Sequence, residues 1–284
     1  MAGIQLDLFS WDKVKIVEGY KALSVMNFEG AETIFKEVIL HAPDHSLARE
    51  GMEMADYWSK IFQRVESLQG EKELLFLWEK IKGYSFTKEN GPQQFRKSLI
   101  ENLLRQMNRS SSFYIPPDLC SGYLYIVLKD YTKAEKALKA LVADHPFNGR
   151  ILGYLADSIW MQDKISEAQE IYLKALLIAP HEVSLKEIKN DELLEIIEDS
   201  GIYMTPVYGW LRNILPLRDI KVKKTYNKEH ERCLKIYQVI RKAENVRKDG
   251  NNEKVIEQRK LLKQIAPEVF EKYFERIKQM RIFG

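Results

Sequence analysis

Residues 148–180 read NGRILGYLADSIWMQDKISEAQEIYLKALLIAP, and this stretch decides the expected fold. Residues 115–146, IPPDLCSGYLYIVLKDYTKAEKALKALVADHP, repeat its pattern at a step of 34 positions. A period of about 34 residues built from small, aromatic and proline positions is typical of a repeated helical hairpin. The matching pairs are Gly122 with Ala156, Tyr125 with Ile159, Ala134 with Ala168, Leu138 with Tyr172, Leu141 with Ala175, and Pro146 with Pro180.

Each residue type in this pattern has a physical role in a helical hairpin. Ala156 and Ala168 are small, which lets the two helices approach closely, and Tyr172 fills the space beside that contact. Pro180 cannot continue a helix, so it is expected to end the second one. Three capping boxes are expected at helix starts. They are Ser166 with Gln169, Thr132 with Glu135, and Ser184 with Glu187.

The unit ending at Pro180 resembles a tetratricopeptide repeat (TPR), whose pattern is Trp, Leu-Gly, Tyr, Ala, Phe and Pro at set spacings. Those places are held here by Leu152, Leu155-Ala156, Ile159, Ala168, Tyr172 and Pro180. The unit ending at Pro146 departs from the pattern, with Asp118 in place of Trp and Ser121 in place of Leu. A third unit, residues 12–43, keeps Gly19, Ala31, Phe35 and Pro43. The resemblance implies an all-α fold, a right-handed superhelix of stacked hairpins.

The rest of the chain is also expected to be mostly helical. Helices are predicted over residues 46–68, 74–81, from Pro92 to Leu104, and over 184–199, 229–248, 253–266 and 268–280. Residues 108–117 are expected to form a loop, and residues 203–216 a short helix or a packed turn. Three parts follow: residues 1–114 with one TPR-like hairpin and degenerate helices, 115–182 with two tandem units, and 183–284 with divergent repeats and a basic cap.

Composition restricts the protein class. The 284 residues are 45% hydrophobic and 30% charged, and no apolar run approaches the roughly 18 residues that span a bilayer. Two cysteines exclude a disulfide framework, so the expected location is the cytoplasm, with no membrane partner. The net charge is +3, but residues 218–284 contain 19 Lys and Arg against 10 Asp and Glu.

Catalytic and metal-binding motifs are absent from the sequence. It has no glycine-rich phosphate loop, no HExxH and no GxSxG, so we expect neither an enzyme nor a cofactor. Pro43 separates His41 from His45 and breaks the helix that would put both on one face, so we expect no metal site. The hypothesis is a non-enzymatic scaffold that binds a peptide or partner protein.

The resemblance also implies where a partner would bind. In TPR proteins, ligand contacts come mainly from the first helix of each hairpin, which lines a concave groove. The corresponding residues are Tyr20, Leu23 and Ser24, then Tyr123, Ile126 and Val127, then Asp157, Trp160 and Met161. Lys and Asn, which clamp a peptide carboxylate in chaperone-binding TPRs, are absent at these positions. The alternative is that these side chains bury against neighbouring helices, so that the chain fills its own groove.

A short motif at the N-terminus offers a second hypothesis. Gln5, Leu6, Leu8 and Phe9, in QLDLF, resemble the peptide by which bacterial replication and repair proteins dock on the sliding clamp. The protein would then be a nucleic-acid-associated adaptor that uses its basic region, residues 218–284. Alternatively, Ser10 caps a helix that begins at Trp11, and Phe9 packs on Val14 as a hydrophobic staple.

Overall fold

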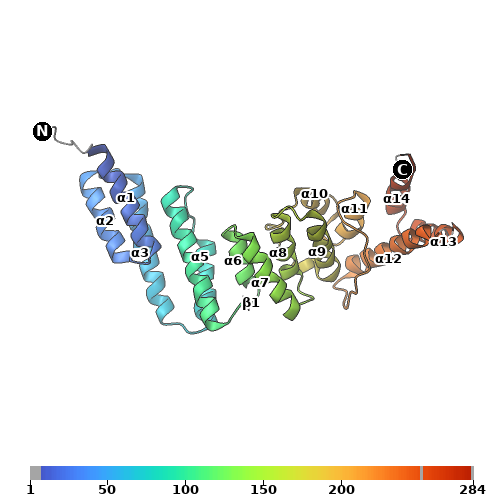
Figure 1. Cartoon of the computed structure of the whole chain (residues 1–284), viewed down its shortest axis with the longest axis horizontal. Helices are drawn as coiled ribbons and strands as arrows, with labels where there is room; N and C mark the ends of the chain where they lie inside the picture. Colours follow the sequence, from blue (N-terminus) through green and yellow to red (C-terminus); the bar gives the residue numbers. More distant parts are fainter. Residues whose placement is uncertain (1–7, 250–251, 283–284) are drawn as a thin grey trace. The chain divides into compact units, whose positions relative to one another are not determined.

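The computed structural model describes residues 8–249 and 252–282, whose regular structure is mostly α-helix (Figure 1). Fourteen α-helices lie in these ranges, together with one pair of two-residue strands. The chain divides into two compact units, Met1–Leu124 and Tyr125–Gly284. The all-α prediction is therefore confirmed, and none of the described helices is long and apolar enough to cross a membrane.

The first unit is built from consecutive helices. Helix α1 packs on α2, α2 packs on α3, and α5 returns to pack on α1. The antiparallel strands β1 and β2 follow, pairing Ile115 with Leu119. The elements are α1 (Leu8–Ser24), α2 (Phe28–His41), α3 (Ser46–Glu66), α4 (Glu71–Gly83), α5 (Asn90–Ser110), β1 (Tyr114–Ile115), β2 (Leu119–Cys120) and α6 (Ser121–Val127), whose last residues belong to the second unit.

The second unit contains the repeat of residues 148–180, most of the repeat of residues 115–146 and the basic C-terminal helices. Helix α7 packs on α8 and α8 on α9, while α12 packs on α13 and α13 on α14. The elements are α7 (Tyr131–Asp144), α8 (Gly149–Trp160), α9 (Ile165–Ile178), a 3-10 turn (Pro180–Glu182), α10 (Asp191–Ser200), α11 (Thr205–Leu211), α12 (Lys228–Lys248), α13 (Asn252–Ile265) and α14 (Pro267–Ile282).

The repeat positions lie where the helical-hairpin prediction requires them. Ala156 and Ala168 are fully buried between α8 and α9, and Tyr172 is 1% exposed. In the first unit, a Cβ atom on Gly19 would lie 2.5 Å from Cε1 of Phe35, so only glycine lets α1 approach α2 this closely. Each expected terminal proline follows its helix, because α2 ends at His41, α7 at Asp144 and α9 at Ile178.

The predicted capping boxes are wrong, because other residues cap α7 and α10 and no side chain caps α9. Asp130 caps α7 by accepting from the backbone N–H of Lys133 at 3.2 Å, and Asn190 caps α10 by accepting from Leu193 at 3.0 Å. Helix α9 begins at Ile165 with no side-chain cap, and α1 begins at Leu8, so Ser10 is not an N-cap.

Three other segments can be compared with the secondary structure that the sequence predicts for them. The helix expected from Ser184 begins only at Asp191, and the residues before it form turns. The expected loop at residues 108–117 contains the end of α5 and strand β1. Residues 203–216 contain a short helix, α11, which starts with Pro206 in its first turn.

Candidate partner-binding surfaces

A pocket of about 430 Å³ lies between α1 and α5 in the first unit. Tyr20 forms part of its wall, and its hydroxyl donates to the carbonyl of Leu47 at 3.2 Å. A Cβ atom on Gly91 would lie 2.4 Å from Cδ2 of Tyr20, so glycine at the start of α5 permits the close approach. The lining residues are Ile16, Val17, Tyr20, Lys21, Ser24, Leu47, Glu89, Asn90, Gly91 and Gln94.

The rim of this pocket carries exposed apolar and charged side chains. Val17, which lines the pocket, is 64% exposed, and Val14, one turn before it on α1 and outside the lining, is 54% exposed. Lys21 and Glu89 are exposed on the lining and make no ion pair with any described residue. Mostly apolar walls with a few polar or charged groups are the usual composition of a binding pocket.

The residues of the first unit that were expected to line the groove differ in their exposure. Tyr20 is 4% exposed yet borders the pocket, and Ser24 also lines it. Leu23 is fully buried, so its side chain reaches no partner in this conformation. Helix α1 packs on α2, α3 and α5, and the packing of α5 on α1 is a long-range contact that the periodicity of the repeats does not predict.

The side chains of α6 that were expected to line the groove are mostly covered by other residues. Tyr123 packs edge-on against Trp78, with ring centroids 5.9 Å apart. Ile126 is 5% exposed, and Val127 is half-buried. These side chains mainly serve packing, as the alternative to the groove hypothesis expects.

Asp157 is a buried residue that hydrogen-bonds to neighbouring elements and does not face a groove. Its side chain is buried, and Oδ1 accepts from the Tyr172 hydroxyl at 2.5 Å and from the Lys189 backbone N–H at 3.0 Å. Burial raises the pKa of the Asp157 carboxyl to about 8. Asp157 therefore ties α8 to α9 and to the turns before α10.

The other two residues of the same repeat that were expected to line the groove lie nearer the surface. Trp160 is half-buried, with its ring centroid 6.5 Å from that of Tyr172. Met161 follows the end of α8 and is 41% exposed. Of the three positions expected on α8, Met161 is the most accessible to a partner.

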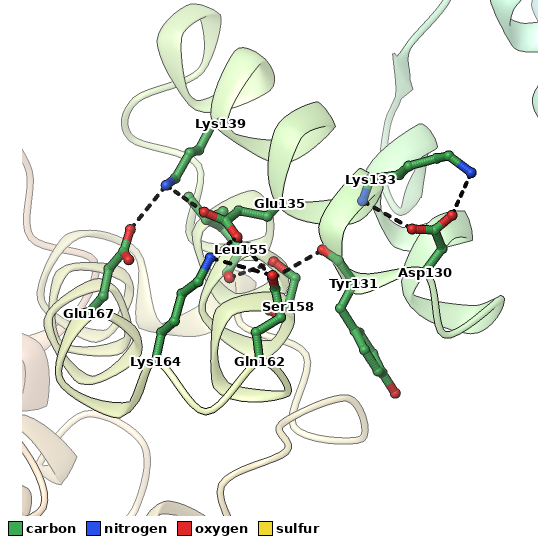
Figure 2. Close-up of polar contacts among 10 residues, drawn as sticks. All are labelled: Asp130, Tyr131, Lys133, Glu135, Lys139, Leu155, Ser158, Gln162, Lys164 and Glu167. Carbon is green, nitrogen blue, oxygen red and sulfur yellow. Dashed lines mark hydrogen bonds and ion pairs between the residues drawn. The ribbon is translucent and has the colours of Figure 1, made fainter.

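A cluster centred on Glu135 links α7 to the turn between α8 and α9 (Figure 2). Its carboxylate accepts from Lys139 at 2.6 Å, from Lys164 at 2.7 Å and from Gln162 at 2.9 Å. Hydrogen bonds from Lys139 and Lys164 lower the pKa of Glu135 to about 2, so it is ionised throughout the neutral range. Lys139 also reaches Glu167 at 3.1 Å, which extends the cluster to α9. The cluster joins one hairpin to the next.

Many cations of the basic region already have partners within the second unit. Arg218 pairs with Glu170 at 2.7 Å, and Arg241 pairs with Asp219 at 2.8 Å. Seven others lie over aromatic rings, a contact that leaves the charge in place. These pairs are Lys223–Phe147, Lys224–Tyr226, Arg259–Tyr273, Lys263–Phe270, Lys272–Tyr208, Arg276–Trp210 and Lys278–Phe274.

The remaining candidate sites give no geometry for chemistry. Gln5 and Leu6 lie outside the described residues, as do the side chains of Leu8 and Phe9, so clamp docking stays a prediction. His41 packs edge-on against Trp11, and His45 lies 3.7 Å from Asp12. Among the described residues, no group of His, Cys, Asp and Glu is arranged to hold a metal ion. Cys120 and Cys233 are buried free thiols.

No family model, curated protein or solved structure matches this chain.

Proposed function

We propose that this protein is a non-enzymatic scaffold, built from TPR-like hairpins, that binds a partner polypeptide in the pocket between α1 and α5. The observation that carries the proposal is the coincidence of two independent features. The pocket is apolar and open, and its wall includes Tyr20 and Ser24, two positions from which the TPR resemblance expects ligand contacts.

The size of the pocket favours a short anchor. A volume of about 430 Å³ accommodates one or two large side chains of a peptide rather than a whole helix. Exposed Val14 and Val17 extend the apolar surface beyond the pocket along α1. Burial of a large apolar side chain in such a place contributes about 1.5–3 kcal/mol, which is typical of an interface anchor.

Charge restricts the partner further. Lys21 lies on α1 and Glu89 lies just before α5, so the two walls carry opposite charges. A peptide with an aromatic or leucine anchor, an acidic residue on one side and a basic residue on the other would complement both walls.

Selection from a displayed random-peptide library on the full chain tests this proposal. Enriched peptides should carry a large apolar anchor, and Val17→Glu should weaken their binding by about tenfold or more. The matched control is Leu40→Glu, because Leu40 is an apolar residue on α2 that is 82% exposed and does not line the pocket. Absence of enriched peptides, or equal loss of binding in both variants, would contradict the proposal.

A further inference from the structure

Residues 216–226 form an unusual connection between α11 and α12 in the second unit, and we name them the strap. The backbone of the strap makes neither a turn nor a bend along its length. Burial alternates along residues 220–223: Ile220 and Val222 are half-buried, and the lysine that follows each of them, Lys221 and Lys223, is exposed. This alternation with a period of two is the side-chain pattern of a β-strand. The strap therefore has the form of a single strand without a sheet.

Specific contacts hold the strap on the helices beneath it. The backbone N–H of Arg218 donates to the hydroxyl of Tyr237 at 2.9 Å, and that hydroxyl donates to the carbonyl of Arg218 at 3.1 Å. Asp219 pairs with Arg241 on α12 at 2.8 Å. Lys223 lies over the ring of Phe147, with 3.9 Å from Nζ to the ring centroid. The strap is thus held at residues 218, 219 and 223 before any partner arrives, which lowers the ordering cost of binding.

The main chain of the strap is unpaired beyond Arg218. From residue 219 to residue 226, no backbone N–H or C=O makes a hydrogen bond to another described residue. A segment with the burial alternation of a strand and a main chain without hydrogen bonds is a template on which an extended peptide can pair.

The charge of the strap identifies the chemistry of that peptide. Lys221, Lys223, Lys224 and the following Lys228 are exposed, and none of them pairs with a carboxylate in the described part of the chain. The carboxylate of Glu182, which lies near Tyr226, already accepts a hydrogen bond from the backbone N–H of Gly149 at 2.7 Å. A second copy of the strap would oppose lysine to lysine and is disfavoured. A nucleic acid would satisfy the charges but not the row of unpaired main-chain groups.

We propose that the strap binds an acidic, extended peptide, which adds beside it as a second strand and places carboxylates against Lys221 and Lys223. Side chains two apart on a strand lie about 6.6–6.8 Å from each other, so Glu or Asp at alternate positions matches these two lysines. This surface lies in the second unit and is independent of the pocket between α1 and α5.

The test measures binding of the full chain to a fluorescent peptide of alternating glutamate and valine. Binding should be salt-sensitive, and K221E/K223E should weaken it by about tenfold or more. K242E/K260E is the matched control, because it makes the same charge change at exposed lysines of α12 and α13 and should leave binding unchanged. Circular dichroism of each variant verifies that the helices are intact.

Two further probes separate strand pairing from charge alone. Peptides N-methylated at one alternate set of residues should lose binding, whereas methylation of the other set should be tolerated, because only one set faces the strap. A single-stranded oligonucleotide of equal charge should bind more weakly than the peptide. No binding of the acidic peptide, tolerance of both methylated sets, or tighter binding of the oligonucleotide would each overturn the proposal.

Discussion

Replacing Asp157 with asparagine should make the stability of the second unit less dependent on pH. The carboxyl is 2% exposed, and burial raises its pKa from 3.8 to about 8 in the folded state. Between these values the folded chain holds the proton and the unfolded chain does not. Stability contributed by this group is therefore complete below the unfolded pKa and is lost as pH rises toward the folded pKa.

The magnitude follows from proton linkage. One proton bound only by the folded state changes the free energy of unfolding by about 1.4 kcal/mol per pH unit. From about pH 5 to pH 7, Asp157 should thus remove about 3 kcal/mol of stability from the wild-type protein. Asparagine does not titrate, and its side-chain oxygen can still accept from Tyr172 and from the N–H of Lys189, so D157N should lack this slope.

Urea unfolding followed by circular dichroism at several pH values measures the effect. The control is Asp163→Asn, which makes the same chemical change at an exposed residue. Asp163 has a φ of 59°, a conformation that asparagine also tolerates. We expect D163N to keep the wild-type pH slope. Identical slopes for D157N, D163N and wild type would refute the assignment of a buried, protonated carboxyl.

Two further predictions concern the joints between helices. Glu135→Ala removes an acceptor shared by three donors and should lower the free energy of unfolding by about 1–3 kcal/mol. The control is Glu32→Ala, in an exposed ion pair on α2, which should lower the free energy of unfolding by less than about 1 kcal/mol. Equal losses of the two variants in chemical denaturation would contradict the role of the Glu135 cluster. Gly19→Ala places a methyl group against Phe35 and should cost about 1–3 kcal/mol, whereas Gly83→Ala, with no atom within 4 Å of its Cβ, should be neutral or stabilising. A thermal melt in which both alanine variants match wild type would show that α1 and α2 do not need glycine at their contact.

The sequence predicted the helical hairpins well, because their signature is local. Ala156, Ala168 and Tyr172 are spaced by the geometry of two helices in contact, and the structure buries all three. Helix starts were predicted less well. The Ser/Thr-x-x-Glu/Gln pattern matched by chance, while Asp130 and Asn190, which are strong N-cap residues, hold the actual caps.

The candidate surfaces were harder to predict because exposure depends on contacts between distant segments. Leu23 is fully buried in a unit where α1 packs on α2, α3 and α5, and nothing in the period of the repeats encodes the return of α5 to α1. Asp157 looked like a polar groove residue, yet its partners are Tyr172 and the backbone of Lys189. The strap, residues 216–226, has no motif, and the absence of main-chain hydrogen bonds to described residues from 219 to 226 is visible only in the fold.

Site-specific photo-crosslinking tests the proposed scaffold function most directly. A photoreactive residue would replace Val17 on α1 or Gln94 on α5, which are exposed positions on the two walls of the pocket. Replacement of Leu40 on α2 provides the control position. A library-selected peptide that lies between α1 and α5 should crosslink from both walls and not from position 40. Crosslinking from position 40 alone, or equally from all three positions, would contradict binding in this pocket.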